Sequence, residues 1–142
     1  MIIVSACLAG IECKYDATSA NDDKVSTLVA QGKAIPVCPE QLGGLPTLRP
    51  RAKIIGGEGK DVLIGNAKVK TEDGRDVTQN FIKGAQQTLK IAKLVGAKHA
   101  ILKSKSPSCG CGKIYNEKDK LIQGDGVCTS LLKQNGIRVE CI

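Results

Sequence analysis

Apolar residues in this chain fall into short runs with the length of buried strands and longer stretches with the spacing of helices. The run at 2–6 is typical of a strand in a parallel sheet that is covered on both faces. The clearest helical stretch is 77–95, where apolar residues recur with a 3.6-residue period and Gly96 follows as a stop. Further strands are expected at 34–38, 99–103 and 137–140, and further helices at 22–31 and 126–135. This order predicts an α/β, Rossmann-like fold with a mainly parallel sheet and helices on both faces.

Two segments depart from this alternation. The stretch 39–51 contains three prolines and two glycines, which predicts an irregular loop. Short apolar runs near 53–56, 62–64 and 67–70 are separated by glycine-containing turns, which predicts a small inserted β-meander. Because no linker or internal repeat divides the pattern, we expect a single domain over 1–142.

Turn and cap residues predict where the later elements begin. Asp76 is expected to cap the helix 77–95, with Gln79 three residues later as its capping-box partner. Asp125 is expected to cap the helix 126–135 in the same way. Between these helices, the stretch around 114–122 predicts a hairpin that follows a loop rich in serine, glycine and cysteine.

Composition then restricts the class and location of the protein. With 42% hydrophobic and 25% charged residues, the chain is globular, and no apolar run is long enough to cross a membrane. The first residues lack the basic segment of a signal peptide, so we expect a cytoplasmic protein. The three aromatic residues, Tyr15, Phe81 and Tyr115, imply an aliphatic core and give little support to base recognition by aromatic stacking. The net charge of +7 permits an anionic partner such as RNA without requiring one.

The seven cysteines are the first indication of chemistry. Their number is odd, so they cannot all pair within the chain, and a cytoplasmic protein favours metal or thiol chemistry over disulfides. Cys7 lies just past a predicted strand, Cys38 at the end of the next, and Cys109 in the loop after a third. Because the carboxyl ends of parallel strands share one edge of the sheet, we expect these three cysteines to meet there.

Three converging thiolates without a nearby histidine favour an iron–sulfur cluster, in which one iron stays open to a substrate atom. A structural zinc ion would need a fourth ligand, and Cys13 or Cys111 could supply it at spacings that match zinc sites poorly. A third interpretation is that the three thiols simply pack as small apolar side chains.

Several motifs together resemble one known family. The segments are VSACLAG at 4–10, CPEQLGGLPT at 38–47 and LKSKSPSCG at 102–110, with CKYD, RP and DVT between them. In this combination and order the chain resembles the thiouracil desulfidase family, long catalogued as a domain of unknown function, from about residue 3 to residue 139. The chain departs from the family pattern at Ala17, where glycine is usual.

The resemblance implies a [4Fe-4S] cluster held by Cys7, Cys38 and Cys109. It also implies non-redox removal of sulfur from a thiolated uracil, whose sulfur binds the open iron while water attacks the ring carbon. Glu40 corresponds to the catalytic glutamate, and Ser106 is preferred to Ser108 as the catalytic serine.

The remaining predictions concern the substrate. Ser108, Asp16 and Lys103 are expected to bind it, and Lys103 and Arg49 could attract an anion or simply lie in solvent. The expected partner is a small thiolated pyrimidine or nucleotide, with tRNA possible and no membrane or obligate protein partner.

Alternatives remain for each residue and for the whole protein. Glu40 can be a loop carboxylate or helix cap, and serines beside proline commonly satisfy turn amides. His99 is expected to be a core or surface histidine of a strand and not part of a Cys–His catalytic pair. Cys128 is expected to pack in the last helix and Cys141 to be idle. The alternative functions are a metal-stabilised RNA-binding module and, from the Cys109–Gly110–Cys111 sequence, a thiol redox protein.

Overall fold

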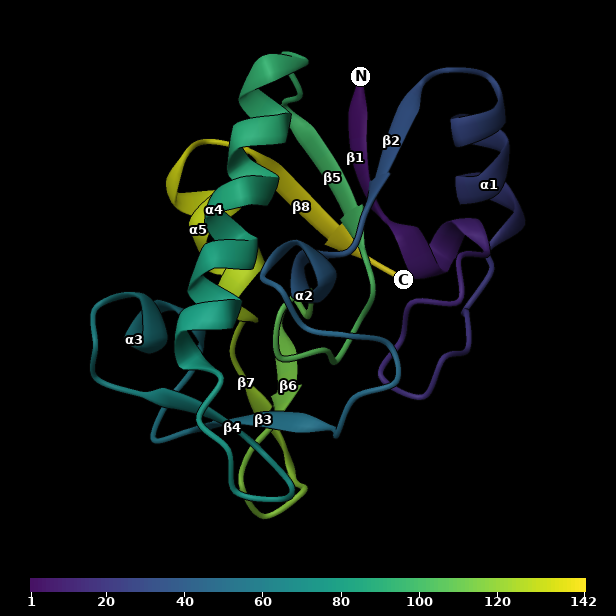
Figure 1. Ribbon diagram of the computed structural model, residues 1–142. Coiled ribbons are helices and arrows are strands. Elements are labelled where there is room, and N and C mark those ends of the chain that lie inside the picture. The colour runs from purple at the N-terminus through teal and green to yellow at the C-terminus, as the bar shows by residue number, and fades with distance from the viewer.

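A four-stranded parallel sheet forms the centre of the computed structural model, which describes residues 1–142 (Figure 1). The strand order is β2-β1-β5-β8, and every neighbouring pair is parallel. The strands are β1 (Ile2–Ser5), β2 (Ala34–Val37), β5 (His99–Leu102) and β8 (Arg138–Cys141). The predicted parallel α/β fold is therefore confirmed.

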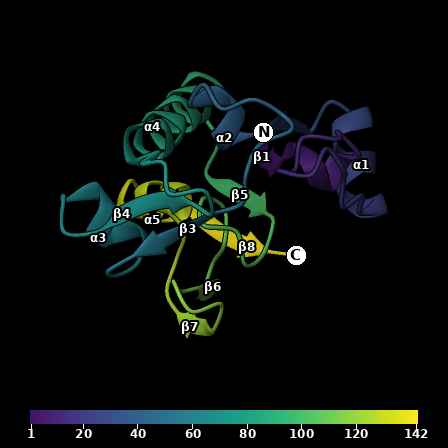
Figure 2. The same ribbon diagram turned by 60° about the horizontal axis from the view of Figure 1, so that its bottom comes forward.

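Side chains alternate across the sheet and build a core on each face. On β1, Ile3 belongs to the larger core cluster and Val4 to the smaller one. The larger cluster includes Phe81 and Leu132, from α4 (Thr78–Leu94) and α5 (Val127–Gln134). The smaller cluster includes Val25, from α1 (Asp23–Ala30). Figures 1 and 2 show α1 on one side of the sheet and α4 with α5 on the other.

The short helix α2 (Pro39–Leu42) corrects the prediction of an irregular loop over 39–51. Pro39 occupies the first helical position, where its missing N–H costs no hydrogen bond. The helix then lies directly against α4, because Gly43 and Gly84 have no side chains. A Cβ on Gly84 would be 1.9 Å from the carbonyl oxygen of Pro39, and one on Gly43 would be 2.0 Å from that of Asn80. Two glycines thus permit the contact between these helices.

The inserted β segment is a two-stranded hairpin and not a three-stranded meander. β3 (Ala52–Ile55) pairs antiparallel with β4 (Lys68–Thr71), whereas the expected strand at 62–64 overlaps the end of helix α3 (Gly59–Leu63). Glu58 and Asp61 form a reciprocal capping box at the start of α3. Three apolar residues in a row could not distinguish a strand from this buried helical turn.

The two predicted caps also need correction. Asp76 accepts a hydrogen bond from the Thr78 N–H at 2.9 Å, but Val77 is the cap residue and the capping box with Gln79 does not form. Gly126 caps α5, while Asp125 accepts a hydrogen bond from the Gly112 N–H at 2.8 Å.

A second hairpin confirms the prediction for 114–122. It consists of β6 (Lys113–Tyr115) and β7 (Leu121–Gln123), which pair antiparallel. Both hairpins lie beyond the carboxyl ends of the sheet strands, below the sheet in Figure 1. They therefore extend the molecule at the edge where ligands bind in open α/β folds. No helix in the structure has the length and apolar character needed to span a membrane.

Candidate active site

A cavity of about 310 Å³ lies at the carboxyl edge of the sheet, and Cys7, Cys38 and Cys109 all line it. Cys7 is in the short 3-10 helix η1 (Ala6–Ala9) that directly follows β1. Cys38 directly follows β2 and is the cap residue of α2, and Cys109 is in the loop after β5. The convergence expected from the strand order is thus present in the structure.

All three cysteines are free, and they are well shielded from solvent. Cys7 and Cys109 are buried, and Cys38 is half-buried. Burial raises the pKa of the Cys109 thiol well above its usual range, with repulsion from neighbouring acidic groups adding to the effect. A hydrogen bond with Cys13 and burial likewise raise the pKa of Cys38. The pKa of Cys7 is instead lowered, chiefly by its hydrogen bond with Cys13. Ionisation of Cys38 and Cys109 is therefore unfavourable in the cavity unless positive charge lies beside them.

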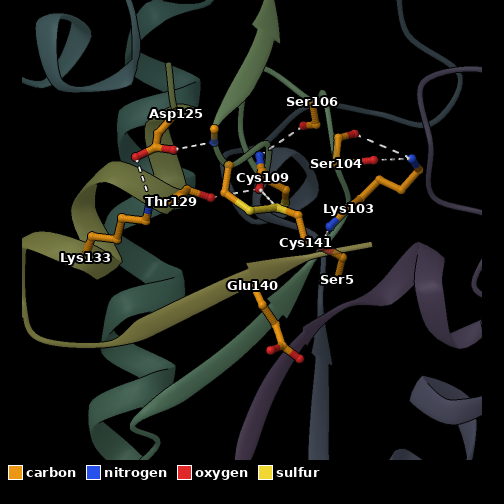
Figure 3. Close-up of a disulfide and its surroundings, with 12 residues drawn as sticks. Ser5, Lys103, Ser104, Ser106, Cys109, Asp125, Thr129, Lys133, Glu140 and Cys141 are labelled. Atoms are coloured by element: carbon orange, nitrogen blue, oxygen red, sulfur yellow. Dashed lines mark hydrogen bonds and ion pairs between the residues drawn. A yellow bond between two sulfur atoms is a disulfide. The ribbon is translucent and has the colours of Figure 1, made fainter. Parts of the chain in front are cut away.

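The backbone around Cys109 is held by neighbouring hydroxyl groups (Figure 3). The Ser106 Oγ accepts hydrogen bonds from the N–H groups of Ser108 and Cys109, at 3.1 and 3.0 Å. The Thr129 hydroxyl donates to the carbonyl oxygen of Cys109 at 2.8 Å. At the sheet edge, Ser5 Oγ accepts the Lys103 N–H at 2.9 Å, which joins the ends of β1 and β5.

Glu40 enters the cavity from the first turn of α2 and is paired with a buried arginine. The Arg49 Nε donates to Glu40 Oε1 at 3.0 Å, and the Arg49 side chain is only 4% exposed. Burial raises the pKa of Glu40, and the guanidinium opposes this shift. The sequence analysis expected Arg49 either to lie in solvent or to attract an anionic substrate. Neither expectation holds, because its side chain is buried and paired with Glu40.

Arg49 also connects Glu40 to two other segments. Its Nη2 donates to the carbonyl oxygen of Cys13 at 2.9 Å. Its Nη1 donates to the Pro46 carbonyl and the Thr47 hydroxyl, both at 3.1 Å. Since Cys13 is buried and lines the same cavity, this arginine fixes the carboxylate relative to the thiol-lined wall.

Of the other predicted site residues, Ser106 and Lys103 line the cavity, whereas Ser108 and Asp16 do not. The Ser106 hydroxyl accepts two amide hydrogen bonds and keeps its own hydrogen to donate. Ser108 is buried, and its Oγ has no hydrogen-bond partner. Asp16 is exposed and accepts hydrogen bonds from the N–H and hydroxyl of Thr18.

Several cavity residues were missed by the sequence reasoning. Tyr15 and Tyr115, two of the three aromatic residues, line the cavity although the low aromatic content argued against such a role. Ser5, Arg51 and Lys105 line it as well. Amino-acid composition says how many aromatic residues there are but not where they lie in the fold. The one sequence feature that could have placed Tyr15 in the site is its position after Cys13 and Lys14 in the CKYD motif.

The remaining cysteines have separate roles. Cys111 and Cys141 form a disulfide that joins the loop after Cys109 to the end of β8, and neither lines the cavity (Figure 3). The expectation that Cys141 is idle was therefore wrong. Cys128 is fully buried in the larger core, as predicted, and His99 lies on β5 beside Glu140, away from the cavity.

Free thiols, a half-buried carboxylate and a hydroxyl around one cavity at a sheet edge define the site of an α/β enzyme. The family model described as 2-thiouracil desulfurase matches residues 2–141, and the chain belongs to this family. An uncharacterized protein of Bacillus subtilis (strain 168), YbbK, is 52% identical over 141 residues, which cover 98% of this chain and 93% of YbbK. The solved structure of a [4Fe-4S]-dependent thiouracil desulfidase, TudS, is 41% identical with a TM-score of 0.85, covering 99% of this chain and 89% of that one.

Proposed function

We propose that this protein is a [4Fe-4S]-dependent thiouracil desulfidase. The reaction exchanges the thio sulfur for the oxygen of water, so that thiouracil and water give uracil and hydrogen sulfide without net oxidation. The observation that supports it is the meeting of Cys7, Cys38 and Cys109 in one cavity with Glu40, in a family member that is 41% identical to TudS. A small thiolated pyrimidine suits a cavity of about 310 Å³.

The residues around the cavity suit an iron–sulfur cluster. Its wall offers four free thiols, those of Cys7, Cys38, Cys109 and Cys13, and no histidine, and soft sulfur ligands are typical of such clusters. Nowhere do three His, Cys, Asp or Glu side chains come close enough together to bind a single metal ion. We propose Cys7, Cys38 and Cys109 as the ligands.

When bound, a cluster with three protein ligands supplies a Lewis-acidic iron with affinity for the substrate sulfur. The chain's own groups then act on water and on the ring. Glu40, kept in place by Arg49, accepts the proton of the attacking water. Ser106 donates its hydroxyl hydrogen to the ring as charge develops there.

The cavity wall also supports a substrate with a negative charge beyond the ring. Lys14, Lys103 and Lys105 line it, and none of them forms an ion pair with a carboxylate. We therefore include nucleotides, and thiolated tRNA, among the proposed substrates, with Lys103 as a binding residue. We also propose a cytoplasmic location, because a reducing compartment maintains the free thiols around the cavity; there the Cys111–Cys141 bond would be reduced.

Two measurements on the same anaerobic preparation test the function. Iron and sulfide analysis is expected to give about four of each per chain, as a cubane requires. Sulfide release is then followed from 2-thiouracil, 4-thiouracil and thiolated tRNA in parallel. Cys38→Ser is expected to lose both the brown colour and turnover, whereas Cys128→Ser, in the core, retains the colour. Colourless wild-type protein after reconstitution, or no sulfide from any of the three compounds, would overturn the proposal.

A further inference from the structure

Tyr115 brings an aromatic ring to the cavity from a hairpin outside the central sheet. It is the last residue of β6, is half-buried and lines the cavity. The Cζ atom of Arg51 lies over its ring, 5.0 Å from the centroid. This distance is that of a cation–π contact, in which the guanidinium covers one ring face. Because both residues line the cavity, the part of the ring that the guanidinium leaves uncovered can contact a ligand there.

Arg51 is itself held by the hairpin that carries Tyr115. Its Nη1 lies 3.0 Å from Asp119 Oδ1, and Lys53 Nζ lies 2.7 Å from the same oxygen. Asp119 is in the turn between β6 and β7, with a φ of 59°. Ion pairs thus connect the start of β3 to the turn of the β6–β7 hairpin, and they hold the Arg51 guanidinium above the Tyr115 ring.

The hairpin is also fixed to the loop that contains Ser106 and Cys109. Ile114, next to Tyr115, forms an isolated parallel bridge with Lys105 and is 1% exposed. The position of the tyrosine ring is therefore set relative to the catalytic loop. Tyr15 lacks such support, since its side chain is 40% exposed and no cation lies over its ring.

Resting on the proposed function, we infer that Tyr115 stacks on the pyrimidine ring of the substrate, and that Arg51 is the positioning residue that holds the tyrosine. A flat heteroaromatic ring gains most from a flat partner, and aromatic side chains and arginine planes bind unpaired bases in this way. The strength of such a contact depends on the flat shape of the ring and not on the carbon–sulfur bond that breaks. It is made equally in the ground state and the transition state, so it lowers KM and leaves kcat unaffected.

Tyr115→Leu tests this inference in the reconstituted protein. We expect about a tenfold rise in KM for 2-thiouracil or 4-thiouracil, with kcat within about twofold of wild type. Calorimetric titration with uracil, the unreactive product, is expected to show the same tenfold loss of affinity. Tyr115→Phe keeps the ring and is expected to recover most of the uracil affinity that leucine loses. Unchanged uracil affinity in Tyr115→Leu would overturn the inference, as would a fall in kcat at constant KM.

Two further variants separate positioning from folding. Asp119→Asn removes the nearer of the two carboxylates that pair with Arg51, the other being Glu72 at 3.9 Å, and asparagine tolerates the left-handed backbone. The variant is expected to raise KM about threefold with kcat retained. Lys118→Ala, at the exposed tip of the same hairpin, is the control and is expected to behave as wild type. If wild-type protein binds uracil through Tyr115 but releases no sulfide from any thiouracil, the proposed function fails while the ring contact stands.

Discussion

Arg49 and Glu40 depend on each other at the scale of single residues. The arginine is nearly buried, and a buried cation needs a charged or carbonyl partner for its donors. Glu40 and the carbonyl oxygens of Cys13 and Pro46 are among the acceptors around it. The carboxylate gains a fixed orientation in the cavity, which a general base needs before its basicity matters.

Glu40→Gln is expected to reduce kcat for sulfide release by roughly 10²–10⁴-fold, since glutamine has no site to accept the proton from water. The substitution retains the size of the side chain and an oxygen that accepts from Arg49. The iron content and visible absorbance should therefore match wild type. Glu117→Gln, an exposed position in the β6–β7 turn, is the control. Full turnover in Glu40→Gln would exclude this residue as the base.

At the scale of elements, α2 determines where two site residues lie. Cys38 precedes the helix, Glu40 is in its first turn, and the helix lies against α4 through Gly43 and Gly84. This contact is between backbone atoms, so no side chain can change its conformation to accommodate a different distance between the helices. A displacement of α2 along α4 would move the thiol and the carboxylate together.

Gly84→Ala should reveal this dependence. Its Cβ would meet the Pro39 carbonyl oxygen at 1.9 Å, so α2 must shift away from α4. We expect a loss of about 1–3 kcal/mol in the free energy of unfolding, measured by urea denaturation, together with lower turnover. Gln86→Ala, on the exposed face of the same helix, should change neither quantity. Unaltered stability and activity in Gly84→Ala would show that the helix contact does not position the site.

The disulfide joins two further elements. Cys111 and Cys141 are 30 residues apart, and their bond closes the segment containing the β6–β7 hairpin and α5. In oxidised protein, Cys141→Ser is expected to lower the free energy of unfolding by about 3–4 kcal/mol, since the unfolded chain regains the freedom of that loop. Reduction by dithiothreitol should lower the free energy of unfolding of the wild type to that of the variant. Seven titratable thiols in denatured, unreduced wild type would contradict the bond.

At the scale of the whole molecule, the cavity exists only when distant segments meet. Its cysteines come from η1, the end of β2 and the loop after β5, so no unfolded chain presents them together. A group that binds all three stabilises the folded state over the unfolded one. Cofactor content and folding are therefore coupled in this protein.

Removal of iron by an anaerobic chelator is expected to lower the melting temperature by roughly 10 °C, the order given by a few kcal/mol of binding linkage in a domain of this size. Differential scanning calorimetry before and after reconstitution measures the shift. Cys38→Ser, with one proposed ligand removed, should show a much smaller change. Equal melting temperatures for iron-loaded and iron-free wild type would show that the cysteines do not hold the cluster in the folded state.

Local pattern in the amino-acid sequence was enough to determine the parallel sheet, its main helices and the three cysteines that follow its strands. These features arise from hydrophobic period and from the rule that parallel strands end on one side. Short elements were less predictable, as the helical turn at Gly59–Leu63 and the helix at Pro39–Leu42 show, because four or five residues contain too little periodicity.

Only the tertiary structure decided the pairing of Arg49 with Glu40, the bond between Cys111 and Cys141, and the place of Tyr115 in the cavity. Each joins residues that are far apart in the sequence or on different elements. Such contacts depend on packing distances between those elements, and local pattern contains no information about them.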